Sequence, residues 1–199
     1  NYINVRIDNL SIENTVAKVQ PLWIEYGKDV KLDNVHCKGG THKGVYIDKC
    51  YRVDIEGGSY ICEASITSPA QQYGISIASS YFVTITKADT FGTRHAVAIG
   101  GGTSIEGGEP AGAGGLPDEI AGVPTYMTTI DGSILKNNSQ LYTADIHGCA
   151  INTTYKNNKI YGGCAISGLN VTYDHNDVYL NDDYIAFNFI EYLGCDVRI

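Results

Sequence analysis

An aspartate and a histidine two residues apart, Asp145 and His147, are the pair in this sequence with the clearest chemical potential. If they lie on one strand, both side chains project from the same face, because alternate residues of a strand share a face. A carboxyl group can act as general acid or base, and histidine titrates near neutral pH. The pair predicts an acid–base site or, alternatively, a hydrogen-bond network that braces the turn at Gly148.

If the ligand is a glycan, two reactions would use such a pair. In elimination from a uronic acid, a base removes the C5 proton while an acid or a cation stabilises the enolate. Hydrolysis instead needs a second carboxyl group beside Asp145. The candidates for this group are Glu106, Glu109, Asp118 and Glu119 in a Gly-rich stretch, or Asp48 and Glu25 on predicted strands.

Strands that recur at a regular spacing must position these residues. Short apolar–polar alternations begin at Leu22 and Val45, 23 residues apart, and at Ala144 and Cys164, 20 residues apart. The segments are β-branched and Tyr-rich and lack the Leu signature of leucine-rich repeats, so each repeat is a coil that needs neighbours to bury its apolar face. We predict an all-β, right-handed parallel β-helix solenoid of about seven to eight coils, forming one domain over residues 1–199.

One stretch interrupts the repeat. Residues at about 100–125 are too long and too rich in Gly and Pro for a coil, so we expect them to leave the solenoid as an excursion. Such insertions often border a binding face, although a mobile surface loop without a role is the alternative. Neither end of the sequence resembles a solenoid cap, so we expect the chain to be part of a longer protein.

Aligning the repeats predicts two outward columns of side chains on one face. The first column is Trp23, Tyr46, Ser76, Ala98, Asp145, Ala165 and Ala186. The second column is Glu25, Asp48, Ala78, Gly100, His147, Ser167 and Asn188. Small residues on either side of the Asp–His pair would leave a groove with that pair on its floor.

Other residues of this face are candidates for binding a substrate. The aromatic rings of Trp23 and Tyr46 could stack on sugar rings. Arg94 should point outward and could pair with a sugar carboxylate, whereas His95 has inward parity and is predicted to be buried at a corner. The substrate-binding candidates are Arg94, Trp23, Tyr46, Asp48, Ser76 and Ser167.

Composition excludes several classes of protein. The 43% hydrophobic and 18% charged residues are unlike a disordered chain, and no apolar run is long enough to span a membrane. The net charge of −8 disfavours nucleic acids and anionic membranes as partners. The six cysteines lack the CxxC spacing of zinc sites and fall in apolar patterns, which predicts reduced, buried thiols. We expect no metal and no cofactor.

The sequence resembles the β-helices of bacteriophage tailspikes, and its later coils are similar to pectate-lyase-like coils. The segments that carry the resemblance are Thr93-Arg94-His95 with the Gly-rich excursion, Asp145-Ile146-His147-Gly148, Asn158-Lys159-Ile160-Tyr161 and Asn176-Asp177-Val178-Tyr179. Neither the calcium-binding Asp set of pectate lyases nor the complete catalytic set of polygalacturonases is recognisable. No catalytic set can therefore be transferred whole.

The resemblance implies a homotrimer on the virion tail, synthesised in the host cytoplasm, that binds and often cleaves a bacterial capsule or O-antigen. Tyr-rich outer faces could form the trimer contacts. Three functions follow: a polysaccharide depolymerase, with glycoside hydrolysis favoured over elimination; a receptor-binding fibre without catalysis; or a stiff structural β-helix.

Overall fold

The computed structural model describes residues 2–14, 20–39, 43–63, 72–100, 124–138, 142–147, 150–180, 186–189 and 197–198. Within these ranges the chain forms strands and no helix, so the described part contains no helix that could cross a membrane. The predicted excursion at about 100–125, with Glu106, Glu109, Asp118 and Glu119, lies almost wholly outside the described residues.

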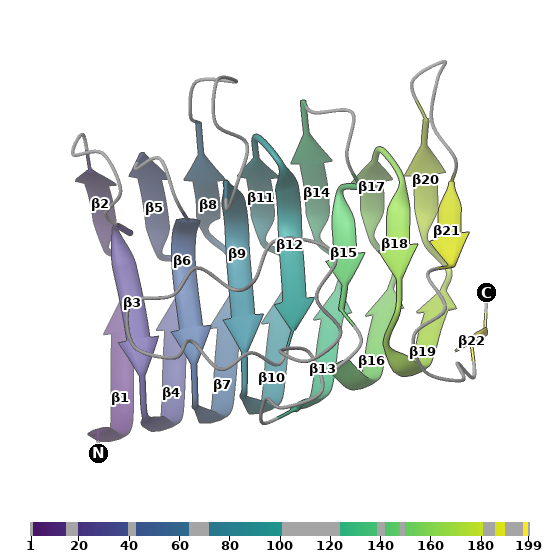
Figure 1. Ribbon diagram of the computed structural model, residues 1–199. Helices are drawn as coiled ribbons and strands as arrows, with labels where there is room; N and C mark the ends of the chain where they lie inside the picture. The colour runs from purple at the N-terminus through teal and green to yellow at the C-terminus, as the bar shows by residue number, and fades with distance from the viewer. Residues whose placement is uncertain are drawn as a thin grey trace.

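The strands form three parallel sheets that wind around one axis, so that every third strand belongs to the same sheet (Figure 1). Sheet A contains β1 (Tyr2–Asp8), β4 (Gly27–Asp33), β7 (Tyr51–Glu56), β10 (Tyr81–Thr86), β13 (Thr125–Asp131), β16 (Ala150–Lys156), β19 (Leu169–Asp174) and β22 (Val197–Arg198). Sheet B contains β2 (Ser11–Asn14), β5 (His36–Gly39), β8 (Ser59–Cys62), β11 (Asp89–Gly92), β14 (Ile134–Asn137), β17 (Lys159–Tyr161) and β20 (Asp177–Tyr179). Sheet C contains β3 (Leu22–Glu25), β6 (Lys43–Asp48), β9 (Tyr73–Ala78), β12 (His95–Gly100), β15 (Ala144–Ile146), β18 (Cys164–Ile166) and β21 (Phe187–Phe189).

This arrangement confirms the predicted parallel β-helix. One coil consists of one strand from each sheet, and each strand pairs with its equivalent in the next coil, as Val30 pairs with Val53 and Val53 with Val83. These inward residues are fully buried and join the equivalent positions of sheet C in one continuous core. Alternation along each strand therefore separates core residues from the outer face, as the sequence predicts.

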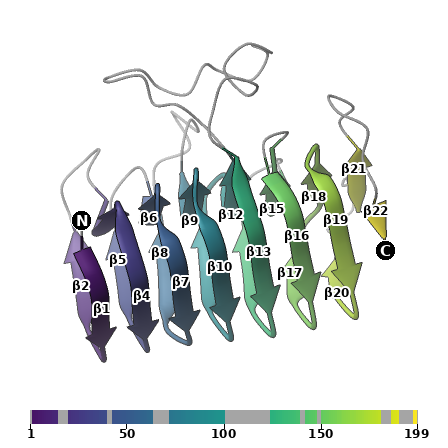
Figure 2. The ribbon, with the colours of Figure 1, turned by 90° about the horizontal axis from the view of Figure 1, so that it is seen from below.

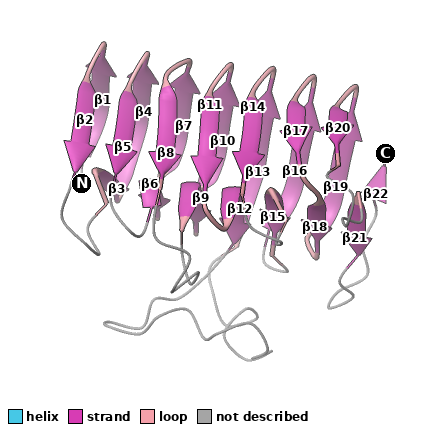
Figure 3. Ribbon diagram, turned by 90° about the horizontal axis from the view of Figure 1, so that it is seen from above, coloured by secondary structure: helices cyan, strands magenta, loops and turns pink. Residues whose placement is uncertain are grey.

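A tight turn joins each strand of sheet A to the next strand of sheet B along one edge of the solenoid (Figures 2 and 3). Residues with a left-handed backbone conformation make this turn. They include Asn9, Asn34 and Asn157, with φ between 52° and 55°, and Gly57 and Gly132, with φ of 64° and 60°. Asn and Gly are the types that tolerate this conformation.

The cysteines described by the structure behave as core residues. Cys37, Cys50, Cys62 and Cys164 are buried and form no disulfide. Burial raises the pKa of Cys37, Cys62 and Cys164 to about 12, so these thiols stay protonated and unreactive near neutral pH. Cys149 and Cys195 lie outside the described residues.

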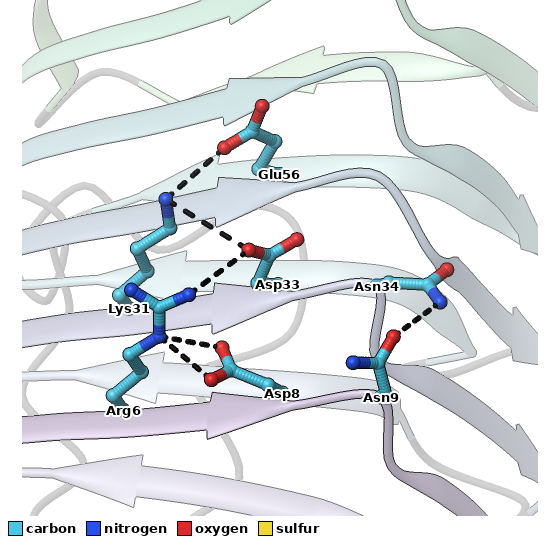
Figure 4. Close-up of polar contacts among 7 residues, drawn as sticks. All are labelled: Arg6, Asp8, Asn9, Lys31, Asp33, Asn34 and Glu56. Carbon is cyan, nitrogen blue, oxygen red and sulfur yellow. Dashed lines mark hydrogen bonds and ion pairs between the residues drawn. The ribbon is translucent and has the colours of Figure 1, made fainter.

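The outer face of sheet A is polar over its first coils. Arg6 binds Asp8 at 2.7 Å, Lys31 binds Glu56 at 3.1 Å, and Arg6 also reaches Asp33 at 3.4 Å (Figure 4). All of these side chains are substantially exposed, so solvent screens the ion pairs. They make this part of the face soluble rather than holding the coils together.

A buried asparagine joins the turns of successive coils instead. Asn158 accepts a 2.9 Å hydrogen bond from the Ser133 amide and donates to the Ile130 carbonyl and the Asn176 side chain, both at 2.9 Å. The backbone amide of Asn158 also donates to the side-chain oxygen of Asn176, at 3.0 Å. Removing this side chain leaves buried backbone groups without partners, which costs more than the bonds themselves contribute.

We therefore expect Asn158→Ala to lower the free energy of unfolding by about 3 kcal/mol, measured by urea denaturation. Asn157→Gly is the matched control. Asn157 precedes Asn158 in the chain and has a left-handed backbone that glycine also adopts, and its side chain forms a hydrogen bond only at the exposed surface. Its effect should stay within about 0.5 kcal/mol. Equal losses in the two variants would contradict the assignment.

Candidate functional site

The register of sheet C confirms most of the predicted first column. Trp23 pairs with Tyr46, and the pairing continues through Ser76, Ala98 and Asp145 to Ala165. The last member is wrong: Ala165 pairs with Asn188, not with Ala186. The shift of two residues keeps the alternation intact, so the apolar pattern of this segment fits either register.

Asp145 lies between two histidines. Its Oδ2 atom is 3.0 Å from Nε2 of His147 and 3.2 Å from Nε2 of His95. The Asp145 side chain is 12% exposed and that of His95 only 2%, whereas His147 is 37% exposed. We call Asp145, His95 and His147 the Asp145 cluster. His147 is the member of this cluster that a large ligand can reach.

The place of His95 corrects the sequence analysis. His95 is buried as predicted, but it does not face the core as its parity indicates. Ala96 and Val97 are both fully buried core residues, and the amides of both bond the single carbonyl of Thr143. Two successive inward residues break the alternation at this corner, as in a β-bulge. The bulge turns His95 toward Asp145 on the outer face.

The protons of His95 follow from its partners. A carbonyl can only accept, so Nδ1 of His95 donates to the carbonyl of Tyr142. In the neutral ring, Nε2 then presents a lone pair to the Asp145 carboxylate. The contact is favourable only when a proton lies between these two atoms.

The histidines also govern the charge of Asp145. Burial by itself would raise the pKa of this carboxyl, but His147 and His95 outweigh burial and hold the pKa well below its usual range. Burial lowers the pKa of His95, with Asp145 opposing that shift. Asp145 is therefore an anion at neutral pH, suited to orient a histidine rather than to donate a proton.

Arg94 and two tyrosines border the cluster. The Arg94 guanidinium lies 5.9 Å from the ring of Tyr73 and donates to its hydroxyl at 3.4 Å. Tyr73 in turn stacks on His95, with ring centroids 5.3 Å apart. On the opposite side, the Tyr142 hydroxyl accepts a hydrogen bond from Asn188. Hydrogen bonds and ring stacking thus connect the cluster to Arg94 and to both tyrosines.

The first two coils of sheet C present an aromatic surface. Trp23 is 55% exposed, and its ring lies 5.8 Å from that of Tyr46 at a shallow angle of 31°. The Lys43 ammonium sits 3.5 Å above the Tyr46 ring. We call Trp23 and Tyr46 the aromatic platform. It lies three to four coils from Asp145, or about 14–19 Å at the usual strand spacing.

The remaining predicted site residues are less accessible. Asp48 is 1% exposed and binds Lys49 at 3.2 Å, and Lys49 also binds Glu25 at 3.0 Å. Ser167 donates to the carbonyl of Ile146 at 2.7 Å, and Ser76 is almost fully buried. These residues support the face. The structure brings neither Asp48 nor Glu25 to Asp145, because whole coils separate them.

A cavity of about 170 Å³ lies elsewhere, at the first coil, between Val5, Leu22, Trp23 and Val30. Most of its lining residues belong to the apolar core or pack against it, and none belongs to the Asp145 cluster. Among the described residues no group of three or more His, Cys, Asp or Glu is arranged to hold a metal ion.

Comparison with known families identifies the chain. A protein-family model described as "Gp49, pectin lyase-like" matches residues 38–187, about three quarters of the sequence. The chain belongs to this family. No curated protein sequence matches this pectin lyase-like chain.

Solved structures place the pectin lyase-like chain beside bacteriophage tailspikes, which confirms the resemblance seen in the sequence. The tailspike gp61 of Pseudomonas phage phi297 has a TM-score of 0.68 and 21% identity over 88% of this chain and 27% of its own. The Gp54 tailspike of Acinetobacter baumannii bacteriophage AP22, solved with a capsular saccharide, has a TM-score of 0.68 and 24% identity over 84% of this chain and 25% of its own.

A third relative in structure is an enzyme. The A-module of the Azotobacter vinelandii mannuronan C-5 epimerase AlgE4 has a TM-score of 0.53 and 11% identity over 99% of this chain and 57% of its own. The pectin lyase-like chain thus spans about a quarter of the length of the two tailspikes. At sequence identities of 11% to 24%, the similarity to these three structures shows that they share a fold with this chain.

Sequence reasoning missed three members of this site. His95 was predicted to face inward at a corner, Asn188 was placed in the second column with His147 rather than in the first, and Tyr142 was not singled out. The adjacent Arg94-His95 pair was the available signal, since two basic residues at a corner are unusual in a core position. The bulge that redirects His95 leaves no mark in the alternation itself.

We expect Asp145→Asn to destabilise the protein by about 3 kcal/mol at pH 7, because it removes the buried charge that the imidazole of His147 contacts. A carboxyl whose folded pKa is depressed contributes its stability above the unfolded pKa of about 3.9 and loses it as the pH falls below that value. Urea denaturation at pH 7 and at pH 3 should therefore show a difference between variant and wild type that shrinks at pH 3.

The matched control is Asp54→Asn, which changes an exposed carboxyl on β7. It should leave stability unchanged at both pH values. A penalty for Asp145→Asn that stays constant between the two pH values would mean that the ionised carboxylate does not stabilise the cluster.

Proposed function

We propose that this chain binds a bacterial surface polysaccharide, a capsule or an O-antigen, along the outer face of sheet C and cleaves it at the Asp145 cluster. The aromatic platform would hold sugar rings by stacking, and the cluster would act on a residue further along the same glycan. One tailspike of this fold was solved with a capsular saccharide, and another protein of this fold is an epimerase of mannuronan. Both relations support a carbohydrate as the ligand.

The observation that carries the proposal is the pair of imidazoles on one carboxylate. Among the described residues, both side chains that form an ion pair with Asp145 are histidines, and the two predicted carboxyl partners that the structure describes, Asp48 and Glu25, lie whole coils away. Two-carboxylate hydrolysis needs such a group at about 5–9.5 Å. Removal of a proton next to a carboxyl group needs a base held in one tautomer and a nearby cation. The geometry supports elimination from a uronic acid best.

The steps follow from the contacts. Asp145 accepts the Nε2 proton of His147, which leaves the lone pair of the neutral ring on Nδ1. His147 takes the C5 proton of the uronate, and the electron pair moves into the sugar carboxyl group, whose charge Arg94 would offset. Collapse of this enolate forms the C4–C5 double bond and breaks the bond from C4 to the glycosidic oxygen. The protonated His147 returns its proton to that oxygen, so the enzyme is restored.

Hydrolysis is the second candidate reaction. It would use Asp145 with Glu106, Glu109 or Asp118, the acidic residues of the predicted excursion. In either case we infer that the chain works as a homotrimer in a virion tail component, and its similarity in fold to phage tailspikes supports the place in the tail. A fibre that binds the same glycan without cleaving it is the alternative that the experiment below separates.

We expect the protein to shorten one member of a panel of capsular and O-antigen polysaccharides, followed by size-exclusion chromatography. Elimination leaves a double bond conjugated to a carboxyl group, which absorbs in the ultraviolet. His147→Ala should reduce the rate about 10³-fold, since it removes the base. Asp145→Asn should reduce it less, because the base remains but loses its orientation.

Asp54→Asn again serves as the control and should keep full activity. Shortened chains without new absorbance would establish hydrolysis in place of elimination. Retention of a glycan without any shortening would establish a binding fibre and make the Asp145 cluster structural.

A separate prediction concerns the aromatic platform. Trp23→Ala should raise KM about tenfold and leave kcat unchanged, because stacking far from the reacting bond holds substrate and transition state equally. The side chain is more than half exposed, so the fold should be retained. Steady-state kinetics on the cleaved glycan provide the test. A fall in kcat at constant KM would remove the platform from the binding site.

A further inference from the structure

A serine, a histidine and an asparagine lie together where the chain turns from sheet A onto the outer face of sheet B. Nδ1 of His36 is 2.9 Å from the hydroxyl oxygen of Ser59, and Nε2 of His36 is 3.1 Å from the side-chain oxygen of Asn34. We call Ser59, His36 and Asn34 the Ser59 triad. It shares no residue with the Asp145 cluster or with the aromatic platform, both of which are on sheet C.

The coil-to-coil register places the serine beside the histidine. His36 and Ser59 are the first residues of β5 and β8 and are partners in the parallel pairing of these strands. The backbone amide of His36 donates to the carbonyl of Leu10 at 2.8 Å, and that of Ser59 donates to the carbonyl of Val35 at 3.2 Å. Backbone hydrogen bonds between coils therefore hold the two side chains next to each other.

A neighbouring asparagine determines where the protons of the Ser59 triad lie. The side-chain nitrogen of Asn34 donates to the side-chain oxygen of Asn9 at 2.9 Å (Figure 4). The other end of the Asn34 amide, its oxygen, therefore faces His36. An amide oxygen can only accept, so Nε2 of His36 donates to it. In the neutral ring, Nδ1 then carries the lone pair, and the Ser59 hydroxyl donates to this atom.

The Ser59 triad has the arrangement of an activated nucleophile. A hydroxyl that donates to a base, which a third side chain orients, can lose its proton as it attacks an electrophile. Ser59 and His36 are both partly exposed, so a small molecule can reach them. Lys38 lies two residues after His36 on the same face of β5, and its side chain is 56% exposed. Its ammonium can offset negative charge that develops on the electrophile.

The surface beside Ser59 indicates which electrophile fits. Ile61 lies two residues after Ser59 on the same face of β8, and Phe91 is the register partner of Ile61 in the next coil. Both side chains are partly exposed, so an apolar part of a ligand can lie against them. Asp89, the register partner of Ser59, binds Lys136 at 3.4 Å, which balances its charge. The apolar pair therefore favours an uncharged ligand.

We propose that the Ser59 triad hydrolyses uncharged carboxylic esters of small acyl groups, an activity separate from glycan cleavage. The Ser59 oxygen attacks the carbonyl carbon of the ester, and Nδ1 of His36 takes the hydroxyl proton. The tetrahedral intermediate then breaks its bond to the alcohol oxygen, which receives the proton from His36, and the acyl group stays on Ser59. Water attacks this acyl-enzyme with the same base, which releases the carboxylic acid and restores both side chains.

The test is the hydrolysis of p-nitrophenyl acetate, followed by the absorbance of the released p-nitrophenol. The wild type should release product in an initial burst, and mass spectrometry of peptides from the reacted protein should locate an acetyl group on Ser59. Ser59→Ala should abolish the burst and this acetylation. His36→Gln should slow the reaction about 100-fold, because its amide can hold the hydroxyl but cannot take the proton. Circular dichroism should show unchanged β-structure in every variant.

Ser11→Ala is the matched control. Ser11 is the register partner of His36 in the preceding coil, whereas Nδ1 of the ring bonds to Ser59, so this variant should keep the wild-type rate. A Ser59→Ala rate equal to that of the wild type, or acetyl groups found on lysines and not on Ser59, overturns the proposal. The assay contains no glycan, so its result does not depend on whether the Asp145 cluster cleaves a polysaccharide.

Discussion

The hydrogen-bonded register between successive coils is the constraint on which the rest of the structure depends. Once Val30 is paired with Val53, and Val53 with Val83, every other residue of those strands has a fixed partner and a fixed face. A slip by one residue would move the whole core set to the solvent. Extra residues can therefore be accommodated only at the turns, where they do not disturb the pairing.

The same constraint builds the outer surfaces of sheets C and A. On sheet C, register places Asp145 in line with Tyr46 and Trp23, although it lies 99 residues after Tyr46 and 122 residues after Trp23 in the sequence. On sheet A, it likewise aligns Tyr51, Tyr81 and Tyr126 along the axis. Neither surface needs a helix or a second domain to assemble it. Each is a set of outward positions whose inward neighbours hold the core.

Much of this was legible in the sequence because a β-helix repeats one simple rule. The alternation around Val45, Ile75 and Val97 was enough to align the strands and to place Asp145 and His147 on one face. The alignment held for six strands of sheet C and was wrong for the seventh, where Phe187 rather than Ile185 pairs with Cys164. Period-two patterns cannot distinguish registers that differ by two residues.

Only part of the Asp145 cluster could be predicted from the sequence, for a different reason. Asp145 and His147 follow from strand parity, but His95 reaches them through a bulge that depends on the Thr143 carbonyl accepting from two amides. Likewise, Asp48 reads as an outward carboxylate in the sequence, and only the structure shows that Lys49 neutralises it in a buried position. Side-chain pairing across coils is a tertiary property, which local pattern does not encode.

The coil-by-coil construction has a consequence for how such a protein can change. The separation between the aromatic platform and the Asp145 cluster is a whole number of coils, and each coil adds about 4.8 Å. Duplication or deletion of one coil would leave every other contact intact, since coils touch only their neighbours. It would move the platform relative to the cluster by one such increment. The distance between the aromatic platform and the Asp145 cluster is therefore a multiple of one strand spacing, and recombination can change it by single coils without redesign of either end.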